Sequence, residues 1–205
     1  LVTPLGDTEL QGARRGMVAG HDTIAIVDFG SQFTQLIARR VREEGVFCRI
    51  YPCTAPTEEV LGDRSLLKGI ILSGGPNSVY DEGAPSIDRA LLDAGVPVLG
   101  ICYGLQATVH MLGGRVVPGS GGGEYGRTEL VADGLPGAPG RSVVWMSHAD
   151  RVEDLPPGFR RLGHSDSCPF AAVEGFDGRF LGLQFHPEVT HTERGGDILA
   201  HFLHE

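Results

Sequence analysis

The feature that most constrains the fold is an alternation of short apolar runs with helical periodicity through the first half of the chain. The apolar runs have the length and composition of fully buried strands, and they lie at residues 23–28, 46–51, 69–73 and 96–101. Helices are predicted after them, at residues 31–45, 58–67, 86–94 and 103–112. Strands that alternate with helices need crossover connections, which predict a parallel sheet with helices on both faces.

The pattern changes after Gly113. Strand-like runs joined by turns follow at residues 114–117, 126–131, 142–146 and 180–185, and a closing helix is predicted at 198–204. Such strands fit as antiparallel additions to the edge of a parallel sheet. The predicted fold class is therefore α/β: an open, mostly parallel, twisted sheet with helices on both faces and a few antiparallel edge strands.

Two stretches of the chain are predicted to lack regular structure. Residues 1–21 show no sustained periodicity and are interpreted as a disordered N-terminal extension, with Met17 as a natural start after a vector-derived or misannotated stretch. The Gly-rich stretch 119–123 is predicted to be a mobile loop. Residues 22–205 are predicted to form one domain, because a single α/β domain commonly reaches about 200 residues.

Charge and cysteine content argue against several functional classes. The net charge of −9 disfavours a nucleic-acid partner, which needs a basic surface. No apolar run reaches the roughly 20 residues of a membrane-spanning helix, and no secretory signal is recognisable, so a cytoplasmic location without a membrane partner is expected. The four cysteines form no C-x-x-C pair; they are predicted to be free thiols, and no metal site is expected.

The most informative segment is Gly100-Ile-Cys-Tyr-Gly104, which places Cys102 between a predicted buried strand and a predicted helix. The two glycines match the G-x-nucleophile-x-G turn, in which a flanking side chain would clash with neighbouring backbone. The turn would present the sulfur at the C-terminal edge of the sheet and at a helix N-terminus, which favours a thiolate. The alternative is that Cys102 is a small buried hydrophobic residue.

A candidate base follows the last predicted strand, in Gln184-Phe-His-Pro-Glu188. Residues two apart in an extended segment point the same way, so Glu188 can hold the ring of His186 while the other ring nitrogen faces Cys102. Taken alone, a histidine beside a proline is more often a surface or turn residue. Together with the cysteine turn, it predicts nucleophilic catalysis.

Acyl transfer through a thioester also needs hydrogen-bond donors for the developing oxyanion. The backbone N–H of Tyr103, directly after the nucleophile, is one candidate. The segment Ser73-Gly-Gly-Pro76, at the end of a neighbouring predicted strand, supplies another. An ordinary strand-ending turn is the alternative explanation of that segment.

These motifs carry a family resemblance. Gly-Ile-Cys-Tyr-Gly-Leu-Gln (100–106) and Gln-Phe-His-Pro-Glu (184–188) resemble the class I, triad-type glutamine amidotransferases. Longer motifs resemble one branch of that family, the glutaminase domains of the GMP synthetases, and they lie at residues 28–42, 71–78, 144–148, 167–171 and 186–192. The resemblance covers residues 23–205 and implies the flavodoxin-like fold of class I glutaminases.

The resemblance also implies a reaction and a site. Cys102 would attack the side-chain amide of L-glutamine, His186 would act as the base and acid, and Glu188 would orient His186. The N–H groups of Gly75 and Tyr103 would form the oxyanion hole. Substrate contacts are implied at Gln106, Ser147 and His148. The released ammonia would pass to a separate domain or polypeptide, an ATP pyrophosphatase that aminates adenylylated XMP to give GMP.

Three departures from the family pattern bear on these expectations. No S-G-G-x-D-S loop is present, so ATP and Mg²⁺ are expected to belong to a missing synthetase half, and no cofactor is expected in this domain. Ala149 stands where the family commonly has glycine. Residues 118–141 are Gly-rich and short beside the family. Activity is further predicted to depend on a partner that closes the site, because residues 190–192 follow the triad in an exposed-looking turn.

Two other readings stay open on the sequence alone. One is a cysteine hydrolase of the same fold that acts on a peptide or a γ-glutamyl chain, because fold does not fix the substrate. The other is a non-catalytic regulatory module that keeps an inactive site.

Overall fold

The computed structural model describes residues 21–119 and 122–205 of the 205-residue chain. The predicted N-terminal extension therefore lies, except for His21, outside the described residues, as does the centre of the predicted 119–123 loop. Among the described residues, no helix combines the length and the apolar character needed to cross a bilayer.

The main sheet has nine strands, and its first half is parallel. In spatial order the parallel strands are β2 (Phe47–Pro52), β1 (Thr23–Asp28), β3 (Leu67–Leu72), β4 (Val98–Ile101) and β11 (Phe180–Leu183). The sheet continues with antiparallel strands β10 (Ala172–Gly175), β9 (Arg160–His164), β6 (Glu124–Ala132) and β7 (Gly140–His148). The predicted α/β fold class is confirmed, although two of the antiparallel strands, β9 and β10, were not predicted.

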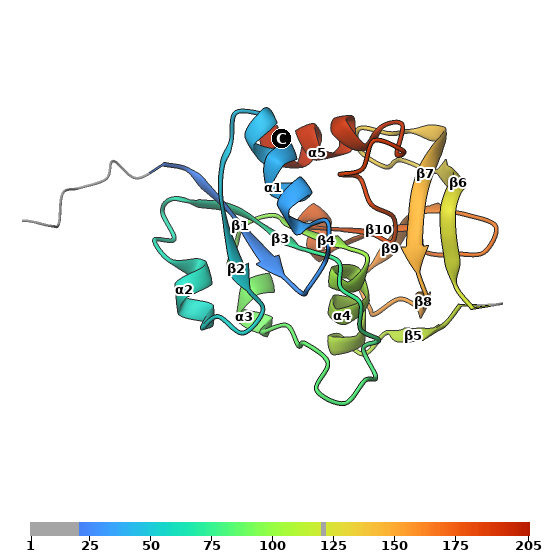
Figure 1. The fold of residues 1–205 in the computed structure, drawn as a ribbon, viewed down its shortest axis with the longest axis horizontal. Helices are drawn as coiled ribbons and strands as arrows, with labels where there is room; N and C mark the ends of the chain where they lie inside the picture. The colour runs from blue at the N-terminus through green and yellow to red at the C-terminus, as the bar shows by residue number, and fades with distance from the viewer. Residues whose placement is uncertain (1–20, 120–121) are drawn as a thin grey trace, which may run out of the picture.

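Helices cover both faces of the parallel half (Figure 1). On one face lie α1 (Thr34–Glu43) and α5 (Gly195–His204). On the other face lie α2 (Thr57–Leu61), α3 (Arg89–Leu92) and α4 (Tyr103–Met111). A single-turn 3₁₀ helix, η1 (Phe176–Gly178), precedes β11.

Alternation along β1 explains how the sheet acquires two apolar cores. Ile24 and Ile26 pack into the core beneath α1 and α5, whereas Ala25 and Val27 pack into the core beneath the other three helices. Successive side chains of a strand point to opposite faces, so a strand that is apolar at every position needs cover on both sides. The uninterrupted apolar run in the sequence follows from this arrangement.

Several predicted elements differ from the structure in partner or length. β11 was expected among the antiparallel edge strands, but it lies inside the sheet, antiparallel to β10 on one side and parallel to β4 on the other. β5 (Arg115–Pro118) leaves the main sheet and pairs with β8 (Asp150–Asp154) in a separate two-stranded sheet. The helix predicted at 58–67 ends at Leu61, where Gly62 takes a positive φ of 45° that breaks the helix.

The first turn of α1 also differs from expectation. The helix was predicted to start at residue 31, but its N-cap position is Phe33, whose N–H donates to Oγ of Ser31. Gly45 ends the same helix as predicted, with a φ of 75°.

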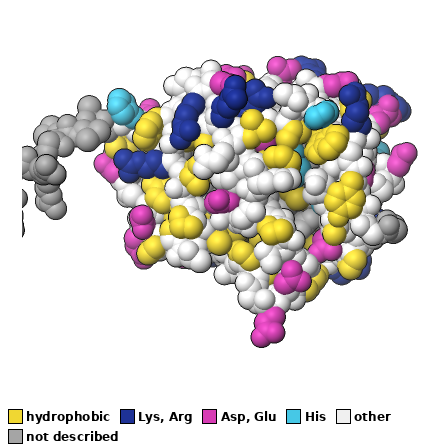
Figure 2. Space-filling model, in the orientation of Figure 1, with side chains coloured by type: hydrophobic (Ala, Val, Ile, Leu, Met, Phe, Trp, Pro, Cys, Tyr) yellow, Lys and Arg dark blue, Asp and Glu magenta, His cyan; other side chains and the backbone are white. Residues whose placement is uncertain are grey.

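Charges of both signs are spread over the visible surface. On the face seen in Figure 2, Lys and Arg side chains lie mainly in the upper part, around α1, and acidic side chains lie around the whole outline. The chain as a whole is acidic, with a net charge of −9.

Candidate active site

Cys102 occupies a strained turn between β4 and α4. Its φ of 50° and ψ of −104° lie outside the conformations that non-glycine residues prefer. The flanking glycines make the turn feasible: a Cβ on Gly100 would approach the backbone nitrogen of Leu105 to 3.0 Å, and one on Gly104 would overlap the carbonyl oxygen of Leu72. This is the geometry predicted for a nucleophile turn.

The imidazole of His186 lies beside this turn. A Cβ built on Gly74 would stand 3.2 Å from Cε1 of His186 and 3.6 Å from Cβ of Cys102, so the two side chains meet over one glycine. Parallel pairing explains the meeting, because Leu183 of β11 lies opposite Ile101 of β4. The cysteine and the histidine therefore both follow the C-terminal ends of adjacent strands.

Glu188 holds the other side of the ring. Its Oε1 accepts a hydrogen bond from Nδ1 of His186 at 2.7 Å, and the two side chains are 0% and 4% exposed. The backbone of His186 is fixed as well, because its N–H donates to the carbonyl of Trp145 and its carbonyl accepts from Oγ1 of Thr192. The ring is thus held so that Nε2 remains for the sulfur.

The surroundings of His186 favour the protonated ring. Burial alone lowers the pKa of His186, but hydrogen bonding with Cys102 and with Glu188 raises the pKa to about 10. An imidazolium beside a cysteine stabilises the thiolate, which is the nucleophilic form.

The turn after the triad is less exposed than expected. Thr190 and His191 are exposed, but Thr192 is buried. Thr192 is buried because its hydroxyl bridges two segments, donating to the carbonyl of His186 and accepting from the N–H of Trp145.

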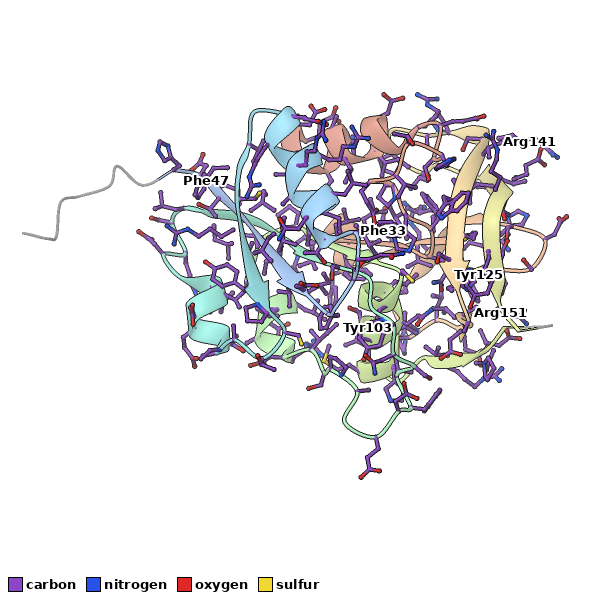
Figure 3. The ribbon with its side chains drawn as sticks, in the orientation of Figure 1. Phe33, Phe47, Tyr103, Tyr125, Arg141 and Arg151 are labelled. Carbon is purple, nitrogen blue, oxygen red and sulfur yellow. The ribbon has the colours of Figure 1, made fainter. Side chains whose placement is uncertain are left out.

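The cysteine and the histidine open into a cavity of about 670 Å³ at the C-terminal edge of the parallel strands. Phe33, just before α1, and Tyr125, on β6, line it from different elements (Figure 3). Tyr125 is 66% exposed, so it forms part of the rim. Phe33 also contacts the ring of His186 edge to face, with 5.2 Å between the ring centroids.

Of the two predicted oxyanion donors, Gly75 lines this cavity, and Tyr103 directly follows the lining residue Cys102. A Cβ on Gly75 would come within 2.7 Å of the carbonyl oxygen of Phe29 and 3.4 Å of Cγ of Tyr103. Only glycine therefore fits at this position beside Tyr103 without a shift of the backbone. The N–H of Tyr103 lies in the first turn of α4, where an amide has no partner within the helix.

The three predicted substrate contacts all line the cavity, but their polar atoms are partly engaged already. Nε2 of Gln106 donates to the carbonyl of Asp150 at 2.7 Å. The carbonyl of Ser147 lies 3.7 Å from the sulfur of Cys102. Nδ1 of His148 lies 2.9 Å from the carbonyl of Asp150, and its Nε2 lies 3.3 Å from Oε2 of Glu124.

Two further residues of the site were missed by the sequence analysis. Asp150 lines the cavity, and its Oδ2 is buried without a partner among the described residues. Gln184 is 0% exposed and places Nε2 3.8 Å from the sulfur of Cys102. Gln184 stands in the quoted 184–188 motif, but nothing in its local pattern indicates that it points at the sulfur.

Ala149 lines the cavity, and its carbonyl accepts a hydrogen bond from the N–H of Gly119 at 2.6 Å. Within residues 21–119 and 122–205, no group of three or more His, Cys, Asp or Glu side chains is arranged to hold a metal ion.

Two curated relatives match most of this chain. The glutamine-hydrolyzing GMP synthase of Enterococcus faecalis is 49% identical over 185 residues, which are 88% of this chain and 35% of that protein. The enzyme of the same name from Mycobacterium bovis is 51% identical over 185 residues, 89% of this chain and again 35% of that protein. The chain thus spans about a third of the length of the curated relatives that it matches.

A solved structure of similar size also matches. The crystal structure of a putative GMP synthase component from Thermoplasma acidophilum has a TM-score of 0.74 and 31% sequence identity. The match covers 88% of this chain and 92% of that chain.

The family assignment follows from a match over almost the whole described domain. The model of the family described as glutamine amidotransferase class-I matches residues 25–205. That range begins in β1, contains the cysteine turn and the histidine–glutamate pair, and ends after α5. The chain belongs to the class-I glutamine amidotransferase family.

Proposed function

We propose that this chain hydrolyses L-glutamine to glutamate and ammonia through a thioester on Cys102. The observation that carries the proposal is the meeting of Cys102 with a buried His186–Glu188 pair at the edge of a 670 Å³ cavity. Family membership supports glutamine as the substrate.

In the first half-reaction the sulfur attacks the side-chain amide carbon of glutamine. The carbonyl oxygen becomes an oxyanion, for which the N–H groups of Gly75 and Tyr103 are the available donors. Protonated His186 gives its proton to the nitrogen, the C–N bond breaks, and ammonia leaves. The products are ammonia and a γ-glutamyl thioester.

In the second half-reaction His186, now neutral, accepts a proton from water as the water oxygen attacks the thioester carbon. The same donors stabilise the second oxyanion. The C–S bond then breaks, which releases glutamate and restores the sulfur. Glu188 keeps Nδ1 of His186 protonated throughout, so Nε2 is the nitrogen that exchanges the proton.

The cavity lining suggests how the two charged ends of glutamine are bound. The buried, unpartnered Oδ2 of Asp150 is suited to the α-ammonium group. No Lys or Arg stands among the described residues that line the cavity, so the α-carboxylate would be bound by neutral donors. Candidates are side-chain amides and hydroxyls of the lining, such as Asn77, Ser78 and Ser147.

We further propose that the ammonia serves a synthetase part that converts XMP to GMP with ATP and Mg²⁺. The names of the E. faecalis and M. bovis relatives support this, and the chain covers only 35% of each of them. The synthetase part would be fused to this domain or would be a separate polypeptide. The proposed location is cytoplasmic, which is supported by four free cysteines, because these suit a reducing compartment.

Ammonia release by the purified chain tests the proposed hydrolysis. Cys102→Ala is expected to abolish ammonia release from glutamine while thermal unfolding stays cooperative, because no other described group can form the thioester at this cavity. Cys53→Ala, at a half-buried cysteine that does not line this cavity, is the matched control and should keep wild-type turnover. Full activity in Cys102→Ala would refute the proposal.

The substrate itself needs a second assay. Free glutamine and γ-glutamyl peptides are compared at equal concentration, and faster release of ammonia from glutamine than cleavage of any peptide is expected. Faster cleavage of a γ-glutamyl peptide would favour the alternative hydrolase reading. Adding the synthetase part to the same assay measures whether turnover depends on a partner.

A further inference from the structure

Among the residues that the structure describes, three polar groups lie close to the sulfur of Cys102. His186 is one of them, and it contributes a positive charge. The carbonyl oxygen of Ser147 lies 3.7 Å away and points its negative end at the sulfur. A carbonyl in this position opposes a thiolate, so another donor is needed to offset it.

The third group is the carboxamide of Gln184, whose Nε2 lies 3.8 Å from the sulfur. A carboxamide donates through its nitrogen and accepts through its oxygen, so the neighbours of Gln184 decide which end faces the sulfur. The contacts of one neighbour, Gln106, determine the orientation of the Gln184 amide. The Gln106 amide bridges Gln184 and the backbone of Asp150.

The chain of hydrogen bonds has one consistent direction. The carbonyl of Asp150 can only accept, so the atom of Gln106 that lies 2.7 Å from it is the donor Nε2. The same Nε2 lies 3.2 Å from Gln184, so the atom it meets there is the acceptor Oε1. The remaining atom, Nε2 of Gln184, must then point at the sulfur of Cys102.

Gln184 is also held rigidly in this position. Its side chain is 0% exposed, and its backbone N–H donates to the carbonyl of Ala171 at 2.8 Å. The preceding carbonyl, of Leu183, accepts from the N–H of Cys102 at 2.7 Å. The amide and the sulfur are therefore fixed against each other by the edge of the sheet.

We propose that Gln184 is a further catalytic residue, whose Nε2–H donates to the Cys102 sulfur and stabilises it as a thiolate. Gln106 is the positioning residue that keeps this donor turned toward the sulfur. The proposal rests on the proposed function only in taking Cys102 as the nucleophile. Because the relay begins at the carbonyl of Asp150, it also connects the substrate end of the cavity with the sulfur.

Peptide-resolved alkylation tests the proposal without glutamine. The thiolate displaces iodide from iodoacetamide, forming a C–S bond as the C–I bond breaks, so the rate follows the thiolate fraction. Mass spectrometry follows the Cys102 peptide across a pH series, and half-buried Cys53 in the same sample is the internal reference. Two variants are compared. Gln184→Met keeps the side-chain volume but has no hydrogen-bond donor, and Gln184→Asn keeps an amide on a shorter side chain, farther from the sulfur.

Both variants are expected to raise the alkylation midpoint of Cys102 by about one pH unit. Below both midpoints, alkylation should then be about tenfold slower than in the wild type. Thr108→Val is the matched control. It removes a buried 2.8 Å hydrogen bond within α4, the helix that carries Gln106, and the side chain of Thr108 does not line the cavity. The control should leave the midpoint unchanged, and thermal melts show which variants fold.

Wild-type midpoints for Cys102 in both folded Gln184 variants would overturn the proposal. The same midpoint shift in Thr108→Val would overturn it too, because the effect would then be a general response to lost packing. Failure of the proposed function would look different. Wild-type protein would then release no ammonia from glutamine while the Gln184 variants still shifted the alkylation midpoint.

Discussion

Replacing Glu188 with glutamine isolates the part that its charge plays in the reaction. Glu188→Gln keeps the side-chain volume in a position that is 0% exposed, and Oε1 can still accept from Nδ1 of His186. The 2.7 Å hydrogen bond then loses its charge. Hydrogen bonds to charged groups contribute about 1.5–3 kcal/mol, about 1 kcal/mol or more above neutral ones.

The cost in the transition state is therefore expected to be about 2 kcal/mol, including weaker stabilisation of the imidazolium. This corresponds to an approximately thirtyfold loss in kcat/KM for ammonia release from glutamine. The pKa of His186 should also fall, because Glu188 is one of the groups that raise it to about 10. The alkaline limb of the pH–rate profile should accordingly move to lower pH.

Protein stability provides a second measurement of the same change. A His186 pKa raised above the unfolded value means that the folded protein binds the proton more tightly. The resulting stabilisation is fully present below about pH 6.5, the unfolded value, and is lost as the pH rises toward 10. Urea titrations of Glu188→Gln should show a smaller loss of unfolding free energy across this window. Wild-type turnover, together with an unchanged alkaline limb, would refute the reasoning.

Three other substitutions test separate parts of the site. Gly104→Ala forces a Cβ onto the carbonyl of Leu72, so urea unfolding should show a loss of about 2 kcal/mol or more, and unchanged stability would contradict the packing. Asp150→Asn removes the charge proposed to hold the α-ammonium group; KM for glutamine should rise at least about tenfold with a smaller change in kcat, whereas an unchanged KM would exclude that contact. Thr192→Val leaves the carbonyl of His186 without its 2.6 Å donor; both stability, by about 1–3 kcal/mol, and turnover should fall, and a loss of neither would show that this anchor is dispensable.

The parallel half of the fold could be predicted because burial on both faces is visible in a single sequence. β1 and β3 are covered by helices on each side, so the centre of β1 and residues 69–72 of β3 appear as apolar runs. The antiparallel half gives weaker signals. β8 is Asp-Arg-Val-Glu-Asp and β9 is Arg-Arg-Leu-Gly-His, in which only one or two side chains of each strand are buried.

Strand partners were less predictable than strands. The apolar Phe-Leu-Gly-Leu of β11 marks a buried strand, but nothing local distinguishes a parallel partner from an antiparallel one. The parallel pairing joins Phe180 to Val98, which lie far apart in the chain, so it is a long-range property. The prediction of an edge position failed for that reason.

The site shows the same division between local and long-range information. The cysteine turn and the histidine–glutamate spacing are short motifs with a direct chemical meaning, so they could be read from the sequence. The importance of Gln184 and Asp150 depends on what lies opposite them. The amide of Gln184 faces the sulfur of Cys102, and Oδ2 of Asp150 is buried without a partner among the described residues. Both facts appear only once the strands are paired.

The neighbouring positions of β4 and β11 have a consequence for how this protein can vary. Between these two strands the chain makes a long excursion through β5 to β10, yet it returns to the hydrogen-bonding edge that it left. Insertions or deletions in the excursion can thus reshape the rim at Tyr125 while the nucleophile and its base keep their spacing. Two of the proposed recognition residues, Ser147 and Asp150, belong to this excursion, whereas Cys102 and His186 follow the paired strands at its two ends.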